Sequence, residues 1–305
     1  MTQDFPVFVA AGEALTDMIV LDAGATQWTS KVGGSTWNVA RAMARLGTPS
    51  GFAGAISRDV FGDQLWQASE AAGLDLRFLQ RVDKTPLLAI VHRLEPPSYF
   101  FVGDDSADLH FDASLLPAGW RAACRWVHFG GISLAREPLA GKLVALAESL
   151  KAAGVRISYD PNFRANMDAR YDATLRRMTA LADVVKVSDE DLAGLLRTDD
   201  ADAAFATLRS WNPAASYLYT KGAAGAAFYT PLGAWTQAAP RVDVVDTVGA
   251  GDASMAALAW SMLHRPDASG QDHLRFAVAG GAAACLAAGA TPPGLEAIEA
   301  LISAL

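Results

Sequence analysis

The sequence predicts an α/β fold with a central, mostly parallel β-sheet flanked by helices. Short apolar runs of β-type residues alternate along the chain with helical patterns, which is typical of a parallel sheet covered on both faces. The length of 305 residues fits one large domain with a small appendage. Hydrophobic residues make up 51% of the chain and charged residues only 19%, which indicates a well-packed globular protein. We therefore expect a single domain over residues 1–305.

The alternation is carried by two sets of segments. The predicted strands are Val7–Ala11, Trp126–Phe129, Val155–Tyr159, Val184–Val187 and Tyr217–Thr220. The predicted helices are Ser35–Leu46, Glu137–Ala153, Tyr171–Leu181 and Ala201–Ser210. In such a fold, ligands bind past the carboxyl ends of the strands, where the loops gather.

Two segments, Asp17–Lys31 and Leu87–His110, depart from the alternation because they look like strands without an intervening helix. The second contains LLAIVHRLEPPSYFF, a hairpin pattern with Pro96-Pro97 at its turn. Antiparallel strands far apart in the sequence can form one small sheet. We expect such a sheet from about residues 15–33 and 86–111, serving as a lid over an active site. An extension of the edge of the main sheet is the alternative.

Composition and charge argue against several classes of partner. The formal net charge of −8 disfavours nucleic acid or an anionic membrane surface as the main partner. No apolar run approaches the roughly 20 residues of a membrane helix, and the start MTQDFPVFVA lacks the basic region of a signal peptide. Cys124 and Cys285 show no C-x-x-C spacing, as expected for reduced, buried thiols, and the five histidines show no metal-binding spacing. We expect a cytoplasmic protein.

A glycine-rich turn, Gly249-Ala250-Gly251-Asp252, precedes an apolar helical run. Glycines permit a tight turn and a close approach of a ligand to the backbone. The first turn of a helix offers unpaired N–H groups and a positive dipole end, so this segment suits a phosphate. Asp252 is either a helix-capping acid or a general base beside the phosphate. The chain contains neither a Walker A loop nor a G-x-G-x-x-G fingerprint.

The stretch DTVGAGDASMAALA resembles the C-terminal signature of the PfkB, or ribokinase-like, family of carbohydrate kinases, and the resemblance spans nearly the whole chain. It implies a ribokinase-like fold and transfer of a phosphoryl group from ATP, with Mg²⁺, to a primary hydroxyl of a small sugar. It also implies that Asp252 is the catalytic base and that the backbone of Gly249, Ala250 and Gly251 forms the anion hole.

The amino-terminal stretches GEALTD and VGGSTWNVARAMARLG resemble the sugar-binding segments of the same family. The resemblance implies that sugar hydroxyls are held by Asp17, Gly33, Gly34 and Asn38. Acid and amide side chains suit this task because they can bind hydroxyls through two atoms. Taken alone, Asn38 is an ordinary polar residue of a helix.

The segment SYDPNFR, Ser158 to Arg164, resembles the DPN-x-R segment of fructokinases and 2-keto-3-deoxygluconate kinases. The resemblance places Asp160, Asn162 and Arg164 near the sugar and the reacting phosphate, for which the planar fork of an arginine is well suited. Taken alone, Asp160-Pro161 is simply a turn.

Two further segments resemble the nucleotide side of the family's site. VVKVSDEDL is similar to a K-x-N-x-x-E element, with Ser188 in place of the Asn and Asp191 in place of the Glu. The resemblance implies that Lys186 and Ser188 contact ATP and that Asp191 helps to hold Mg²⁺. YTKGAAGAAFY is similar to a T-x-G-x-x-G turn. The ATP would lie along Thr220, Gly222, Gly225 and Gly251.

A monovalent-cation site is implied by the same resemblance. Asp246, the carbonyl group of Val248 and the turn near Gly289 match such a site in several relatives. Carboxylate and carbonyl oxygens suit K⁺, and the sequence leaves its occupancy open.

The segments GEALTD, DPNFR and SADLHF together look most like fructokinase, so we expect fructose as the substrate. Val102-Gly103 stand where fructokinases commonly have a Tyr-Arg pair, which keeps 2-keto-3-deoxygluconate and aminoimidazole riboside as alternatives. A sugar or nucleotide sensor without catalytic activity is the hypothesis from another class. We also expect a homodimer formed through the lid, because LLAIV would place apolar side chains on an exposed face.

Overall fold

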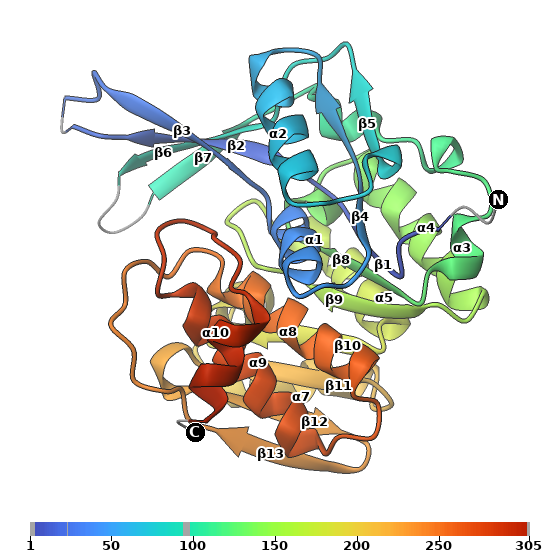
Figure 1. Ribbon diagram of the computed structural model, residues 1–305, viewed down its shortest axis with the longest axis vertical. Helices are drawn as coiled ribbons and strands as arrows, with labels where there is room; N and C mark the ends of the chain where they lie inside the picture. Colours follow the sequence, from blue (N-terminus) through green and yellow to red (C-terminus); the bar gives the residue numbers. More distant parts are fainter. Residues whose placement is uncertain (1–3, 23, 94–97, 304–305) are drawn as a thin grey trace.

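The computed structural model describes residues 4–22, 24–93 and 98–303, which form a nine-strand sheet and a separate four-strand sheet (Figure 1). The strand order of the large sheet is β13-β12-β11-β10-β9-β8-β1-β4-β5. Its neighbouring strands are parallel from β5 through to β11, whereas β11-β12 and β12-β13 are antiparallel. The predicted α/β architecture with a mostly parallel central sheet is therefore confirmed.

The large sheet consists of β1 (Phe8–Ala11), β4 (Ser50–Ser57), β5 (Leu79–Val82), β8 (Trp126–Gly130), β9 (Arg156–Asp160), β10 (Val184–Ser188), β11 (Ser216–Thr220), β12 (Ala226–Thr230) and β13 (Gly233–Gln237). The helices are α1 (Ser35–Arg45), α2 (Val60–Ala71), α3 (Trp120–Ala123), α4 (Leu139–Ala152), α5 (Asp172–Leu181), α6 (Asp189–Leu196), α7 (Ala201–Trp211), α8 (Ala250–His264), α9 (Gly270–Ala284) and α10 (Leu295–Ile302). Short 3-10 helices are η1 (Leu76–Phe78), η2 (Ala107–His110), η3 (Ala113–Leu115), η4 (Ile132–Ala135), η5 (Ala169–Tyr171) and η6 (Gly222–Ala224). The strands and helices predicted from the sequence are confirmed, with ends that agree within two residues.

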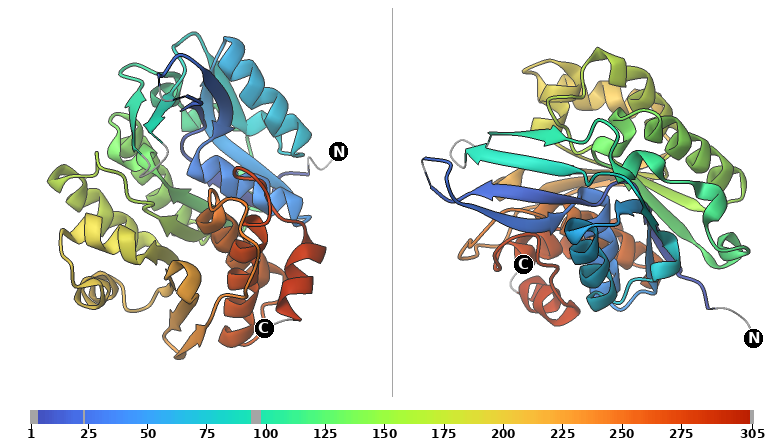
Figure 2. Two further views of the ribbon diagram at one scale, coloured as in Figure 1. Left: turned by 90° about the vertical axis from the view of Figure 1, so that its left-hand side faces the viewer. Right: turned by 90° about the horizontal axis from the view of Figure 1, so that it is seen from above.

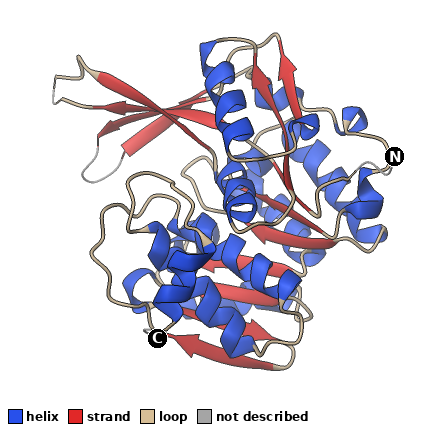
Figure 3. Cartoon of the chain, viewed as in Figure 1, coloured by secondary structure: helices blue, strands red, loops and turns tan. Residues whose placement is uncertain are grey.

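Helices cover both faces of the large sheet (Figures 2 and 3). Successive side chains of a strand point to opposite faces, so β1 contributes to two separate parts of the core. Phe8 packs in the cluster that contains α1, α8 and α9, whereas Val9 packs in the cluster that contains α4 and α5. A strand buried on both faces reads as a continuous apolar run, which is why these strands were visible in the sequence.

The small sheet projects from the main body and consists of β2 (Leu15–Val20), β3 (Trp28–Gly33), β6 (Leu88–Arg93) and β7 (Ser98–Val102) (Figure 1). Its order is β3-β2-β6-β7, with β2 and β6 parallel and the two outer pairs antiparallel. A separate sheet, rather than an extension of the main one, is thus the observed arrangement. The turn predicted at Pro96-Pro97 lies outside the described residues.

The connections of the small sheet are fixed to one short segment after β8. Glu13, between β1 and β2, is buried, and its carboxylate accepts hydrogen bonds from the backbone N–H, at 3.2 Å, and the hydroxyl of Ser133 in η4. Arg136, directly after η4, forms an ion pair of 3.1 Å with the buried Asp108. It also donates to the carbonyl oxygen of Gly103, which follows β7, at 2.6 Å. Residues 133–136 therefore anchor both ends of the small sheet.

In the described part of the chain, no helix is both long and apolar enough to cross a membrane. Both cysteines are free thiols. Cys124 is buried as expected, but Cys285 is only half-buried, because it follows the last turn of α9.

The buried position of Glu13 predicts a pH-dependent stability. Burial raises its pKa from 4.5 to about 7, although the hydrogen bonds from Ser133 lower the pKa in part. Between these values the folded protein keeps a proton that the unfolded chain releases. The free energy of unfolding therefore falls as the pH rises through this window, by roughly 3 kcal/mol in total for a group of this kind. Glu13→Gln removes this loss, so its stability relative to wild type is higher at about pH 8 than at about pH 5.

Urea denaturation of both proteins at the two pH values measures this difference. Glu70→Gln, at an exposed position of α2, is the matched control and leaves the pH dependence unchanged. A difference between Glu13→Gln and wild type that is the same at both pH values contradicts the prediction.

Candidate active site

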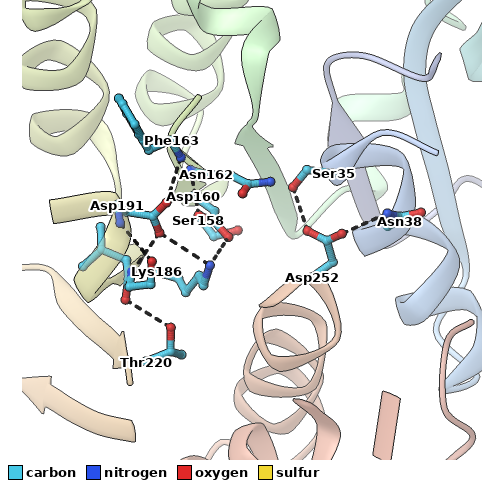
Figure 4. A network of polar contacts seen from close by, with 12 residues as sticks. Ser35, Asn38, Ser158, Asp160, Asn162, Phe163, Lys186, Asp191, Thr220 and Asp252 are labelled. Atoms are coloured by element: carbon cyan, nitrogen blue, oxygen red, sulfur yellow. Dashed lines mark hydrogen bonds and ion pairs between the residues drawn. The ribbon is translucent and has the colours of Figure 1, made fainter. Parts of the chain in front are cut away.

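The residues selected from the sequence gather at the carboxyl ends of parallel strands and at two helix N-termini. Asp160 is the last residue of β9, Ser188 of β10 and Thr220 of β11. Helices α1 and α8 begin beside them. Figure 4 shows Asp252 of α8 between the side chains of α1 and those at the ends of the strands. This is the edge at which open parallel sheets bind ligands.

Asp252 lies in the first turn of α8 and is only 8% exposed. Its Oδ1 accepts a hydrogen bond from the hydroxyl of Ser35 at 2.7 Å, and its Oδ2 accepts one from Nδ2 of Asn38 at 2.9 Å (Figure 4). Burial raises the pKa of Asp252, while these two bonds and the charges of Lys186 and Arg164 lower it in part. The carboxylate forms no capping hydrogen bond with its own helix. Its hydrogen-bond partners both belong to α1.

The N-terminus of α8 presents free amide groups. Gly249 precedes the helix with φ 81°, and a Cβ at this position would lie 2.8 Å from the Cβ of Ala290, so the turn requires glycine. Of the three residues predicted to form the anion hole, Ala250 differs, because its amide donates to the carbonyl oxygen of Thr247. Within the described residues, the amides of Gly249, Gly251 and also Asp252 donate to no protein acceptor. Such amides at the positive end of a 15-residue helix suit an anion.

A buried lysine lies next to these amides. Lys186 of β10 has its Nζ 3.0 Å from Oδ2 of Asp160 and 3.8 Å from Oδ2 of Asp191. The same Nζ is 3.0 Å from the place that a Cβ on Gly251 would occupy. Burial by itself lowers the pKa of Lys186, but the carboxylates of Asp160 and Asp191 together raise it, so the group is an ammonium ion. Burial raises the pKa of Asp160 to about 6, against the effect of Lys186.

Asp191 is engaged by the backbone. With Ser188 it forms a capping box at the start of α6, in which its Oδ2 accepts from the amide of Ser188 at 2.8 Å. Its Oδ1 accepts from the amide of Phe163 at 2.7 Å, which ties α6 to the loop after β9. Among the described residues, no group of three or more acids, histidines or cysteines has the arrangement of a metal cage. The carboxylate of Asp191 is therefore already hydrogen-bonded at the position predicted for a Mg²⁺ ligand.

The expected sugar side contains Asp17, Gly33, Arg164 and Asn38. Oδ2 of Asp17 lies 2.5 Å from the place of a Cβ on Gly33, so a side chain there would displace the carboxylate. Burial raises the pKa of Asp17 to about 6, and the charge of Arg164 opposes that rise. Asn38 leaves its Oδ1 buried without a hydrogen-bond partner. An acceptor of this kind requires a donor, such as a ligand hydroxyl.

The loop after β9 holds its own polar groups together. Asn162 has a left-handed backbone with φ 46°, and its Oδ1 accepts from Nη1 of Arg164 at 2.7 Å. The guanidinium group of Arg164 lies 6.0 Å above the ring of Tyr99 in β7. Arg164 therefore brings the loop after β9 into contact with the small sheet.

The expected nucleotide side is a tight turn between β11 and β12. Gly222 and Gly225 both have positive φ, and a Cβ on Gly225 would lie 2.0 Å from the carbonyl oxygen of Gln237. The amide of Lys221 donates to the carbonyl oxygen of Gly225 at 2.8 Å, which closes the turn. A Cβ on Gly222 would meet nothing within 4 Å, so the turn is open at that residue.

The candidate cation residues also converge. The carboxylate of Asp246 accepts from the amide of Val248 at 3.0 Å and from that of Gly289 at 2.8 Å. The two turns predicted to form a K⁺ site are therefore joined by one acid, and they pack against the turn at Gly249. Each carboxylate oxygen retains capacity for a further partner.

Two residues of this region were missed in the sequence analysis. Ser35 is a neighbour of Asn38 on one face of α1, so its spacing of three residues from the selected amide was a usable signal. Glu13 lies within the quoted GEALTD segment, but only the structure shows its burial against Ser133.

Comparisons with known proteins agree with this geometry. The chain matches the model of the pfkB family of carbohydrate kinases over residues 8–298. It is 34% identical over 252 residues to a fructokinase of Rhizobium leguminosarum bv. trifolii, with 81% of this chain and 76% of the relative covered.

Two solved structures are similar along almost their whole length. A fructokinase from Xylella fastidiosa with bound ATP has a TM-score of 0.87 and 29% identity, covering 98% of this chain and 99% of the other. An aminoimidazole riboside kinase from Salmonella enterica, complexed with aminoimidazole riboside and an ATP analogue, has a TM-score of 0.83 and 29% identity, covering 97% and 99%. The chain belongs to the pfkB family of carbohydrate kinases. Its fold is ribokinase-like, and it is an ATP-dependent carbohydrate kinase.

Proposed function

We propose that this carbohydrate kinase is a fructokinase that uses Asp252 as its general base. The observation that carries the proposal is the position of the buried Asp252 carboxylate. It lies between the free amides at the start of α8 and the α1 side chains of the expected sugar side. A base in this place has an acceptor hydroxyl on one side and a phosphate site on the other.

The chemistry follows from that arrangement. A primary sugar hydroxyl gives its proton to Asp252 while its oxygen forms a bond to the terminal phosphorus atom and the bond from that atom to the leaving diphosphate breaks. The amides of Gly251 and Asp252 stabilise the charge that develops on the transferred group, and the ammonium group of Lys186 lies close enough to add to this field. ATP, when bound beside Thr220 and Gly225, supplies the phosphoryl group.

Arg164 and Asp17 hold the sugar in the proposed site, with Asn162, Gly33, Gly34 and Asn38. Mg²⁺ keeps several waters and binds chiefly to phosphate oxygens in sites of this kind, which fits a protein whose Asp191 is already hydrogen-bonded. Asp246, with the carbonyl group of Val248 and the turn at Gly289, supplies the oxygen ligands proposed for K⁺.

Fructose is the proposed substrate because fructokinases are among the most similar relatives and structures. The residue after β7, Gly103, is the reason to test other sugars as well. Gly103 stands where the resemblance expects an arginine, and a Cβ there would lie 2.6 Å from Leu87 and 2.7 Å from the hydroxyl of Ser106. Glycine carries no side chain, so the proposed pocket binds its sugar without a charge from residue 103.

Release of ADP from Mg·ATP tests the substrate. We expect the highest kcat/KM with fructose in a panel that also contains 2-keto-3-deoxygluconate, aminoimidazole riboside, ribose and adenosine. A higher kcat/KM for another compound of the panel would identify that compound, and not fructose, as the substrate. Binding of ATP without turnover for any member supports the alternative of a non-catalytic sensor.

Asp252→Asn removes the proposed base and keeps the volume of the side chain. We expect turnover to fall by about 10²–10⁴-fold, as for the loss of a general base, with an unchanged melting temperature. Asp272→Asn is the matched control, because Asp272 is also the third residue of a helix, α9, but lies in an exposed capping box. Near-normal turnover of Asp252→Asn would rule out the base.

We also propose that the protein dimerises through the small sheet. The expected apolar face was LLAIV, but Leu87 and Ala89 are buried within the protomer. The exposed apolar side chains belong instead to β7, where Phe100 is 52% and Val102 47% exposed. Since β7 is an edge strand, a second copy would cover both its side chains and its unpaired backbone groups.

Light scattering at micromolar concentration is expected to give the mass of a dimer for the wild type and of a monomer for Phe100→Asp. Leu232→Asp serves as the control, since Leu232 is 94% exposed in the turn between β12 and β13. A monomeric wild type contradicts the proposal.

A further inference from the structure

The hydroxyl of Ser35 binds Asp252, the carboxylate proposed to accept a proton from the sugar. Ser35 is the first residue of α1 and is nearly buried, with its Oγ donating to Oδ1 of Asp252 at 2.7 Å (Figure 4). A serine has a single O–H hydrogen, so this donation uses its only proton. An acceptor sugar approaches a general base through the same interaction, an alcohol O–H pointing at a carboxylate oxygen.

The position of Ser35 is fixed by its neighbours rather than by Asp252 alone. Gly34, with φ 114°, packs so closely on the carbonyl oxygen of Glu13 that a Cβ would lie 2.6 Å from it. The hydroxyl of Thr36 donates to the same carbonyl oxygen at 3.0 Å. Two residues flanking Ser35 are thus tied to the connection between β1 and β2. The hydroxyl is held in place before any ligand arrives, which is the requirement for a preorganised site.

We propose that Ser35 is a positioning residue for Asp252, holding its Oδ1 toward the sugar side and standing in for the acceptor hydroxyl until the sugar binds. This inference rests on the proposed role of Asp252 as the base. A carboxylate oxygen has two lone pairs, so the sugar hydroxyl either joins Ser35 on Oδ1 or takes its place. In both cases Nδ2 of Asn38 continues to donate to Oδ2 and holds the carboxylate in its orientation.

The charges around Asp252 indicate what Ser35 contributes chemically. Lys186 of β10 and Arg164 of the loop after β9 favour the ionised carboxylate, and the nearby Asp160 disfavours it. Burial raises the pKa of Asp252, and the hydrogen bond from Ser35 is the largest of the effects that lower it. Loss of this donor raises the pKa further, so a larger fraction of the enzyme is protonated, and inactive, at low pH.

The test is the pH dependence of kcat/KM for the sugar that the wild type accepts. For Ser35→Ala we expect kcat/KM at the acidic end of the profile to fall about tenfold relative to wild type, because a hydrogen bond to a charged group is lost. On the alkaline plateau the two enzymes agree within about threefold. Ser35→Thr keeps the hydroxyl and restores the wild-type profile. Ser35→Cys keeps the volume of the side chain but has only a weak donor, so we expect the same loss at acidic pH as for Ser35→Ala. It serves as the test if Ser35→Ala folds poorly.

Ser69→Ala is the matched control. Ser69 is another buried hydroxyl in contact with α1, where it accepts from Nε1 of Trp37 at 2.9 Å, but it does not touch Asp252. Its removal leaves the acidic limb of the profile in place. A profile of Ser35→Ala that superimposes on that of the wild type overturns the role of Ser35, provided Asp252→Asn is inactive. An active Asp252→Asn overturns the proposed base instead, so the two failures are distinguishable.

Discussion

The buried carboxylate of Asp252 is the constraint around which the rest of the site is arranged. A carboxylate removed from water is unfavourable unless donors or opposite charges replace its hydration. Ser35 and Asn38 provide the donors from α1. Lys186 provides positive charge from β10, and Arg164 provides it from the loop after β9. Each of these groups lies more than 60 residues from Asp252 in the sequence, so only the folded domain brings them to the acid. The same contacts join the sugar side of the site to its phosphate side.

The side-chain charges beside the free amides of α8 do not by themselves favour an anion. Lys186 pairs with Asp160 and faces Asp191 and Asp252, so the buried carboxylates outnumber the ammonium group. The free amides of Gly251 and Asp252, together with the dipole of α8, are therefore the groups proposed to attract a phosphate. The carboxylates of Asp191 and Asp160 are held by backbone amides and by Lys186, respectively. Neither carboxylate accepts a hydrogen bond from the free amides of α8.

Close backbone contacts define where ligands can approach. Gly249 permits the turn before α8 to pack on Ala290, and Gly33 leaves room for the carboxylate of Asp17. The small sheet is attached on both sides of the site by η4 and its neighbour Arg136, through Glu13 and Asp108. Such an attachment fixes the roots of the sheet while its outer strands extend away from the main body (Figure 1).

Local sequence determined much of this protein. Apolar runs of β-type residues and helical patterns predicted five strands of the large sheet and four helices within two residues, because strands buried on both faces have a strong local signal. The glycine-rich turn before Asp252 predicted an anion site, since the chemistry of such a turn resides in consecutive residues. Tertiary structure alone decided that Ser35 and Asn38 bind Asp252, that Glu13 is buried against Ser133, and that β7 rather than LLAIV is exposed. These features depend on contacts between residues distant in the chain, and burial of that kind leaves no pattern in a local window of sequence.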